Sequence, residues 1–271
     1  MISILPIMPV KTLSIALFAL VFVAVSCGGN GYATLRVFAA SSLTEAFKDI
    51  SLAFEAANSD VVVELDFSGS QWLRSQLEFG AKADVFASAD PIQTDLLVAA
   101  SLVSGMPTDF ASNALVVVAM ANGPVREISD LGKPGIRVVL GQQNVPVGSY
   151  SRQVLENLSL DAELGLGGGF KDDVLANLAS AEPNVNYAFQ KVVLGEVDAG
   201  IVYETNVTNY SEIGSNDVIF ISIPVDANVS TRYSIALLGG ASDPGLAQEF
   251  VGFVLSEDGQ RILGNHGFRS P

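Results

Sequence analysis

Hydrophobic positions follow two alternating patterns along the chain from residue 34 onwards. Short, mostly apolar runs at 34–39 and 61–67 predict β-strands. Between them, in 43–56, apolar side chains recur at the spacing of an amphipathic helix. Strands that alternate with helices in this way indicate βαβ units on a mainly parallel sheet.

The same two patterns continue to the end of the chain. Further strands are predicted at 84–87, 115–120, 136–140, 199–203, 218–224 and 234–238. Further helices are predicted at 72–79, 91–100, 150–158, 185–193, 246–255 and 259–263. These eight predicted strands are many for one sheet, so the pattern favours two α/β lobes.

The first 26 residues differ in kind from the rest. Lys11 is their only charged residue, and 13–25 is an almost unbroken apolar run. This run is too short for a transmembrane helix of about 20 residues, and a positive residue before a short apolar run is typical of an export signal. The run ends at Cys27, the only cysteine, which a glycine-rich stretch follows. We therefore expect a lipoprotein signal peptide at 1–26, with Met8 as an alternative start.

Cys27 then becomes the lipidated amino terminus of the mature protein, and 27–34 is expected to be a linker. The chain should be exported to the periplasm or to the outer face of the cytoplasmic membrane. Its contact with the membrane is expected through the lipid anchor alone, because no later hydrophobic stretch is long enough to span a bilayer.

Charge narrows the possible partners. The 271 residues include 14 basic and 29 acidic side chains, which gives a formal net charge of −15. A surface this acidic argues against nucleic acid and against anionic membranes as partners. It does not exclude a small anion, because a site made of backbone dipoles acts locally.

Three loops between a predicted strand and a predicted helix are rich in serine and glycine. Their sequences are AASSLTE, FSGSQW and VPVGS, at 39–45, 67–72 and 145–149. Ser42 with Glu45 fits a capping box, and Gly69 permits close backbone approach. Each loop leaves unpaired backbone N–H groups at the positive end of a helix dipole, which favours an anion.

None of the three loop cores contains Asp, Lys or Arg. Phosphate near neutral pH is partly protonated, so its recognition benefits from an acceptor carboxylate in the site. A fully ionised dianion such as molybdate, tungstate or sulfate offers only acceptors, and a pocket of neutral donors favours it.

Four motifs carry a resemblance to a known family. They are FAASSLTEAF at 38–47, ADVFASAD at 83–90, VPVG at 145–148 and AGIVY at 199–203. With them the chain resembles the molybdate-binding proteins of ABC importers, in order from about residue 35 to 267. This resemblance implies an α/β, two-lobed periplasmic-binding-protein fold of the second topological type, with the anion in the cleft between the lobes.

The resemblance also implies how the chain divides. Lobe 1 is expected at 35–112 together with 222–271, and lobe 2 at 113–221. Extended crossovers near 113–115 and 220–224 should join them. Each lobe is expected to be a mainly parallel sheet flanked by helices.

Five ligand positions are carried over from the family motifs. Ser42 and Ser70 match the serines that bind the anion from the first lobe. Val147 and Val185 match backbone N–H donors of the second lobe, and Tyr203 matches the tyrosine whose phenol closes the shell. The ligand implied is molybdate, with tungstate as a close analogue; no cofactor is implied, and the implied partners are the membrane subunits of an ABC importer. The protein is expected to be a monomer.

Other classes of function remain to be weighed against this one. An enzyme is not indicated, since His266 is the only histidine and the chain lacks the G-x-S-x-G elbow, the phosphate-binding P-loop motif and a His/Cys metal cluster. Asp84 and Asp90 are a possible carboxylate pair, but aspartates commonly tie loops to backbone amides. A binding protein for sulfate or another tetrahedral oxyanion remains the main alternative.

Overall fold

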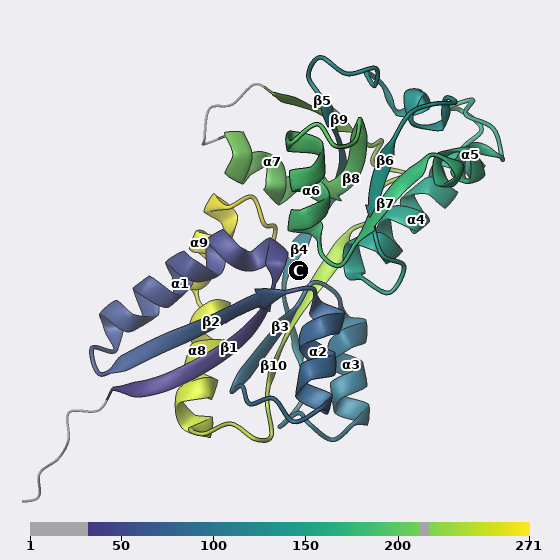
Figure 1. Ribbon diagram of the computed structural model, residues 1–271. Helices are drawn as coiled ribbons and strands as arrows, with labels where there is room; N and C mark the ends of the chain where they lie inside the picture. Colours follow the sequence, from purple (N-terminus) through teal and green to yellow (C-terminus); the bar gives the residue numbers. More distant parts are fainter. Residues whose placement is uncertain (1–31, 212–216) are drawn as a thin grey trace, which may run out of the picture. The chain divides into compact units, whose positions relative to one another are not determined.

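The computed structural model describes residues 32–211 and 217–271, which form two five-stranded sheets with helices packed against them (Figure 1). The predicted signal peptide, Cys27 and most of the predicted linker lie outside these residues. No helix in the described ranges combines the length and the apolar character needed to cross a membrane.

The first sheet has the strand order β2-β1-β3-β10-β4. Its strands are β1 (Ala33–Ala40), β2 (Val61–Ser68), β3 (Val85–Ser88), β4 (Thr108–Asn113) and β10 (Thr231–Leu237). The associated helices are the short 3-10 helix η1 (Ser41–Leu43), α1 (Thr44–Ala57), α2 (Ser70–Glu78), α3 (Pro91–Ala99), α8 (Pro244–Leu255) and α9 (Glu257–Asn265).

The second sheet has the order β7-β6-β8-β5-β9. Its strands are β5 (Leu115–Met120), β6 (Val138–Gly141), β7 (Leu178–Glu182), β8 (Ala199–Tyr203) and β9 (Val218–Ser222). The associated helices are η2 (Ile128–Gly132), α4 (Pro146–Leu160), α5 (Phe170–Ala176), α6 (Val185–Val193) and α7 (Glu204–Ser211). The predicted α/β class with two lobes is therefore confirmed.

The prediction that each sheet is mainly parallel is confirmed for strand direction, since four of the five strands in each sheet run the same way and one strand is reversed. In the first sheet β1 pairs in parallel with β2 and β3, but β10 runs antiparallel to both β3 and β4. In the second sheet β6 pairs in parallel with β7 and β8, whereas β5 runs antiparallel to both β8 and β9. The antiparallel strands β5 and β10 are those at which the chain enters one sheet from the other, so a βαβ crossover does not set their direction.

The predicted elements are present, with six additions that the hydrophobic pattern did not reveal: β4, β7, α5, α7 and the short 3-10 helices η1 and η2. The sequence of β7, LASAE, has no apolar run because the strand lies at the edge of its sheet and its side chains are half-buried or exposed. Helix α4 begins at Pro146, four residues before the predicted start at 150, because proline occupies its first turn.

A buried aromatic cluster supports the first sheet close to where the chain leaves it. Phe47 packs edge-on against Phe110 and Phe250, with ring centroids 5.9 and 6.3 Å apart. Phe110 in turn packs against Tyr233 at 6.2 Å, and both are fully buried. Each such ring contributes about 2–3 kcal/mol through burial, so β4 and β10 are firmly held where they lead toward the second sheet.

The two aspartates considered as a carboxylate pair have structural roles, as predicted. Asp84 accepts hydrogen bonds from the backbone N–H groups of Arg36 and Ser242, at 2.7 and 2.6 Å. Asp90 caps α3 by accepting from the Gln93 N–H at 3.0 Å.

Candidate functional site

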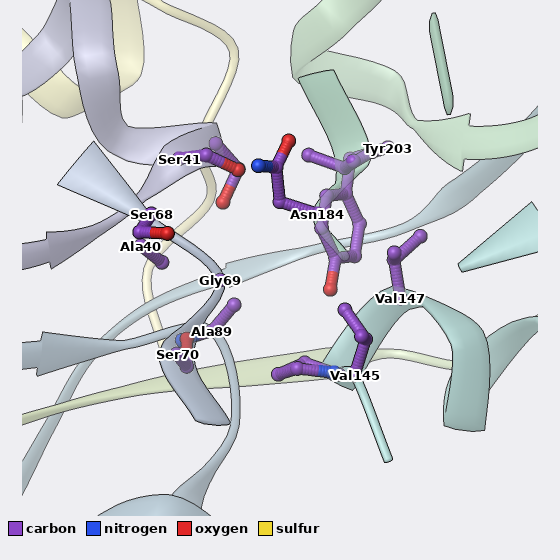
Figure 2. Close-up of a pocket in the computed structure, with 13 residues that line it drawn as sticks. Ala40, Ser41, Ser68, Gly69, Ser70, Ala89, Val145, Val147, Asn184 and Tyr203 are labelled. Carbon is purple, nitrogen blue, oxygen red and sulfur yellow. The ribbon is translucent and has the colours of Figure 1, made fainter. Parts of the chain in front are cut away.

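A small cavity lies where four strands of the two sheets end and the helices that follow them begin. Strands β1 and β2 lead into η1 and α2 from the first sheet, and β6 and β7 precede α4 and α6 of the second. Its volume is about 10 Å³, close to the minimum that admits a water-sized sphere. It is lined by Ala40, Ser41, Ser42, Ser68, Gly69, Ser70, Ala89, Val145, Pro146, Val147, Asn184, Val185 and Tyr203 (Figure 2). Only a compact ligand fits.

Three of the helices that begin at this cavity lack side-chain caps. The residues before η1, α2 and α4 are Ala40, Gly69 and Val145, and none of them caps its helix with a side chain. By contrast, α3, α8 and α9 start elsewhere and are capped by Asp90, Asp243 and Ser256. Because the first N–H groups of a helix have no intrahelical acceptor, the uncapped ends present free donors to the cavity.

Helix α6 contributes a fourth amino terminus. The Asn184 side chain accepts from the Tyr187 N–H at 3.0 Å, so one first-turn donor is used internally. The Val185 N–H, at the first residue of the helix, has no acceptor among the described residues. Sequence reasoning overlooked Asn184 as a lining residue, although asparagine directly before an apolar helical run is a signal for an N-cap.

Ser42 and Ser70 bring hydroxyl groups to the first-sheet side of the cavity. The Ser42 Oγ accepts from the Tyr233 hydroxyl at 3.0 Å, and the Ser70 Oγ accepts from the Ala89 N–H at 3.0 Å. The predicted capping box of Ser42 with Glu45 was wrong, since the backbone forms a 3-10 turn at 41–43 and α1 starts without a side-chain cap. The Ser42 hydroxyl is instead engaged by Tyr233, a residue far away in the sequence.

Tyr203, at the end of β8, lines the cavity on the side opposite Ser70 (Figure 2). Its side chain is 1% exposed, and its hydroxyl has no hydrogen-bond partner among the described residues. Burial raises the pKa of the Tyr203 phenol well above its usual 10, so the group stays protonated and remains a donor. An unpartnered buried hydroxyl costs about 1–3 kcal/mol, which a ligand that accepts from it would recover.

The cavity wall carries no charge. None of its lining residues is Asp, Glu, Lys, Arg or His. The guanidinium of Arg152 is turned to the α4–β6 junction, where Nη1 donates to the carbonyls of Gly141 and Gly148 at 3.0 and 2.7 Å. Nor do the described residues contain a group of three or more His, Cys, Asp or Glu side chains placed to hold a metal cation. The site therefore offers neutral donors to an anion.

Two glycines permit the backbone approaches that shape the cavity. A Cβ at Gly148 would lie 2.0 Å from the Gln142 carbonyl oxygen, so only glycine lets α4 start this close to the end of β6. A Cβ at Gly69 would lie 2.3 Å from the Pro183 carbonyl oxygen, which belongs to the other lobe. Both positions belong to the serine- and glycine-rich loops noted in the sequence.

The structure brings all five predicted ligand residues to one cavity: Ser42, Ser70, Val147, Val185 and Tyr203. His266 lies elsewhere, between Asp49 and Asn209, with its ring nitrogens 2.9 and 3.1 Å from their side-chain oxygens. Trp72, two residues after Ser70, is 58% exposed and does not line the cavity.

Two lobes that meet around a neutral, donor-lined cavity define a protein that binds a small solute. The chain belongs to the bacterial extracellular solute-binding proteins, whose family model matches residues 35–269. It is 37% identical over 260 residues to the molybdate-binding protein ModA of Mycobacterium tuberculosis, covering 91% of this chain and 93% of that protein.

Solved structures agree on the fold. The periplasmic molybdate-binding protein of Azotobacter vinelandii superposes with a TM-score of 0.73 at 18% identity, over 88% of this chain and 99% of that one. The sulfate-binding protein SubI of Mycobacterium tuberculosis superposes with a TM-score of 0.76 at 20% identity, over 88% and 87%. At these identities both establish the fold alone, and they confirm the predicted two-lobed binding-protein architecture.

Proposed function

We propose that this chain captures molybdate outside the cytoplasmic membrane and delivers it to an ABC importer, with Ser42, Ser70, Val147, Val185 and Tyr203 as the ligand residues. The observation that carries the proposal is the uncharged cavity in which the buried Tyr203 hydroxyl has no partner among the described residues. Similarity in sequence to a molybdate-binding protein supports the choice of anion.

The chemistry of the cavity suits a tetrahedral dianion. Its four oxygens accept hydrogen bonds in diverging directions, and the serine hydroxyls, the Val147 and Val185 amides and the Tyr203 phenol converge on the cavity from both lobes. Hydrogen bonds to a charged group are worth about 1.5–3 kcal/mol each, so a handful can offset the loss of the anion's hydration. Tungstate has the same charge and nearly the same size, and we expect it to bind as well.

Delivery depends on the two lobes, which we place at 35–112 with 222–271 and at 113–221. The anion bridges them and stabilises the closed state by its higher affinity for that state over the open one. The closed protein, a monomer that lipid on Cys27 holds at the membrane, then docks on the importer. No cofactor takes part.

Sulfate is the second candidate, because it too is a fully ionised dianion and is smaller, and the cavity of about 10 Å³ is narrow. The donor set would serve either anion. Only the fit between anion radius and closed cavity discriminates between them.

Calorimetric titration of the purified protein with molybdate, tungstate, sulfate and phosphate tests the proposal. Molybdate should bind at least a hundredfold more tightly than sulfate, and phosphate should not compete. At a thousandfold excess over its dissociation constant, molybdate should add about 4 kcal/mol of apparent stability in thermal melts. A sulfate-specific shift without a molybdate shift would contradict the assignment. Calorimetry is preferable to fluorescence here, since Trp72 is exposed.

A further inference from the structure

Four polar side chains form a buried chain of hydrogen bonds behind the anion cavity. Ser42, Tyr233, Asn113 and Thr205 are between 0% and 6% exposed, and only Ser42 lines the cavity. We propose that Asn113 and Tyr233 are positioning residues that fix the Ser42 hydroxyl as a hydrogen-bond donor and thereby select against protonated anions. The inference rests on the proposed function, that the cavity binds an oxyanion.

Asn113, the last residue of β4, determines which group donates and which accepts along this series of hydrogen bonds. Its Oδ1 accepts from the Ala114 N–H at 2.9 Å, and a backbone N–H can only donate. This contact fixes which side of the amide is oxygen. The Nδ2 group then faces the Thr205 Oγ1 at 3.0 Å and the Tyr233 hydroxyl at 3.5 Å. Both amide hydrogens and the amide oxygen are thus in use.

The orientation of the Asn113 amide in turn determines the donor role of Tyr233. The Asn113 Nδ2 has no lone pair to offer, so the Tyr233 oxygen accepts from it and keeps its own proton for another partner. That partner is the Ser42 Oγ, at 3.0 Å. Burial raises the pKa of Tyr233, which keeps this proton in place over the physiological range.

Ser42 therefore receives one hydrogen bond from behind and has its own proton left. With Tyr233 as donor, the remaining Ser42 O–H is free to point into the cavity toward an anion oxygen. Ser70 is held in the same way, because the Ala89 N–H donates to its Oγ at 3.0 Å. Tyr203, buried and protonated, also has a proton to donate. The contacts behind Ser42 and Ser70 thus orient both hydroxyls as donors toward the cavity.

Hydroxyls that are oriented as donors discriminate between anions by protonation state. Molybdate and sulfate carry no proton near neutral pH, so every oxygen can accept. Hydrogen phosphate carries one proton, and an oxygen that bears it cannot accept from the Ser42 or Ser70 hydroxyl without turning that proton toward another donor. A buried donor without an acceptor costs binding free energy, because no new hydrogen bond offsets the loss of its bond to water. This cost disfavours the protonated anion.

Tyr233→Phe tests the role of Tyr233, because it removes the hydroxyl and keeps the packing of the ring against Phe110, Tyr203 and Phe268. The Ser42 hydroxyl would then rotate freely. We expect affinity for molybdate to fall about fivefold, as for the loss of one neutral hydrogen bond. Affinity for phosphate should rise or stay level, so the ratio of molybdate affinity to phosphate affinity should fall by about fivefold or more. Tyr210→Phe, a buried tyrosine outside this cavity, should change neither.

A double-mutant cycle with Ser42→Ala distinguishes positioning from general structure. If Tyr233 acts through Ser42, Tyr233→Phe should have no further effect on affinity once Ser42 is alanine. Additive losses would overturn the inference, as would an unchanged anion ratio in Tyr233→Phe. Titrations of the wild-type protein separate failure of the positioning role from failure of the proposed function. If the wild type binds sulfate and not molybdate, the molybdate assignment is refuted. The same double-mutant cycle is then measured with sulfate.

Discussion

The Gln71 side chain on α2 donates from Nε2 to the carbonyl oxygen of Pro183, 2.9 Å away in the other lobe. Gly69 lies beside it, and a Cβ there would come within 2.3 Å of the same carbonyl. A second hydrogen bond between the lobes runs from the Asn186 Nδ2 to the Ser41 carbonyl oxygen at 2.9 Å. The lobes thus touch at backbone carbonyl groups beside the cavity. Their approach depends on the missing side chain at Gly69 and on the hydrogen bonds that Gln71 and Asn186 donate.

Gly69→Ala should prevent this approach. Real Cβ atoms do not lie 2.3 Å from an oxygen, and the atom in the way is backbone of the opposite lobe. The variant should therefore fold normally with the lobes apart and bind molybdate at least a hundredfold more weakly. Calorimetry measures the affinity, and small-angle X-ray scattering should show that molybdate no longer compacts the protein.

Gly252→Ala is the matched control, because that glycine lies in α8 with no atom within 4 Å of an added Cβ. Alanine is favoured over glycine in a helix by up to about 1 kcal/mol. Gly252→Ala should melt slightly higher and bind as wild type. Equal affinity in Gly69→Ala and Gly252→Ala would show that the contact with Pro183 does not limit closure.

Ser42→Ala and Ser70→Ala each remove one hydroxyl donor from the proposed anion shell. A hydrogen bond to a charged partner is worth about 1.5–3 kcal/mol, so each variant should lose ten- to a hundredfold in affinity. The double variant should lose more than either single one. Ser75→Ala, on the same helix as Ser70 but outside the cavity, should bind as wild type. Unchanged binding by the double variant would place the anion elsewhere.

Much of this site could be predicted from the sequence because local rules govern it. Serine and glycine at the ends of strands place free amides at helix starts, and the structure has η1, α2 and α4 beginning at the cavity as this pattern predicted, whereas Val185 at the start of α6 came from the family resemblance. What the pattern could not supply is contact between distant segments. Nothing near Ser42 in the sequence indicates that Tyr233 donates to its hydroxyl, and a local rule therefore assigned a capping role that the fold does not use.

The same limit explains where the fold departs from the predicted pattern. The alternation of strands and helices predicts parallel pairing, and it holds for β1, β2 and β3, which βαβ units connect. It fails for β5 and β10, whose direction is set by the passage from one sheet to the other. Strand β7 was missed because an edge strand with half-buried side chains has no apolar run to recognise.

Alkaline pH should destabilise the protein through its buried tyrosines. Burial raises the pKa of Tyr203 well above 10 and that of Tyr150 to about 12. In the unfolded chain both phenols lose their protons near pH 10, so above that pH the unfolded state binds fewer protons than the folded state. The contribution of these tyrosines to the free energy of unfolding should therefore be constant below about pH 10 and fall as the pH rises further. Urea denaturation across this range measures the slope, which Tyr203→Phe should reduce; an equally steep slope in that variant would contradict the account.

Affinity for the anion, by contrast, should not depend on pH between about 6 and 9. The proposed donors are backbone amides, the hydroxyls of Ser42 and Ser70, and the Tyr203 phenol, whose pKa burial keeps far above this range. No other ionisable side chain lines the cavity. Titrations at several pH values at constant ionic strength should give one dissociation constant. A tenfold change across the range would show that a charged group outside the wall takes part in binding.

Asn186→Ala should speed release of the anion. The hydrogen bond from Asn186 to Ser41 joins the lobes at the edge of a larger cavity of about 760 Å³, which adjoins the anion cavity because Ser41 and Ser42 line both. Loss of one such bond weakens the closed state by about 1 kcal/mol, which corresponds to a roughly fivefold faster release with little change in association. Stopped-flow displacement of molybdate by excess tungstate measures the release rate. Gln190→Ala, an exposed position on the same helix, is the control and should release as wild type. If Asn186→Ala released molybdate no faster than Gln190→Ala, the bond to Ser41 would have no part in holding the lobes closed.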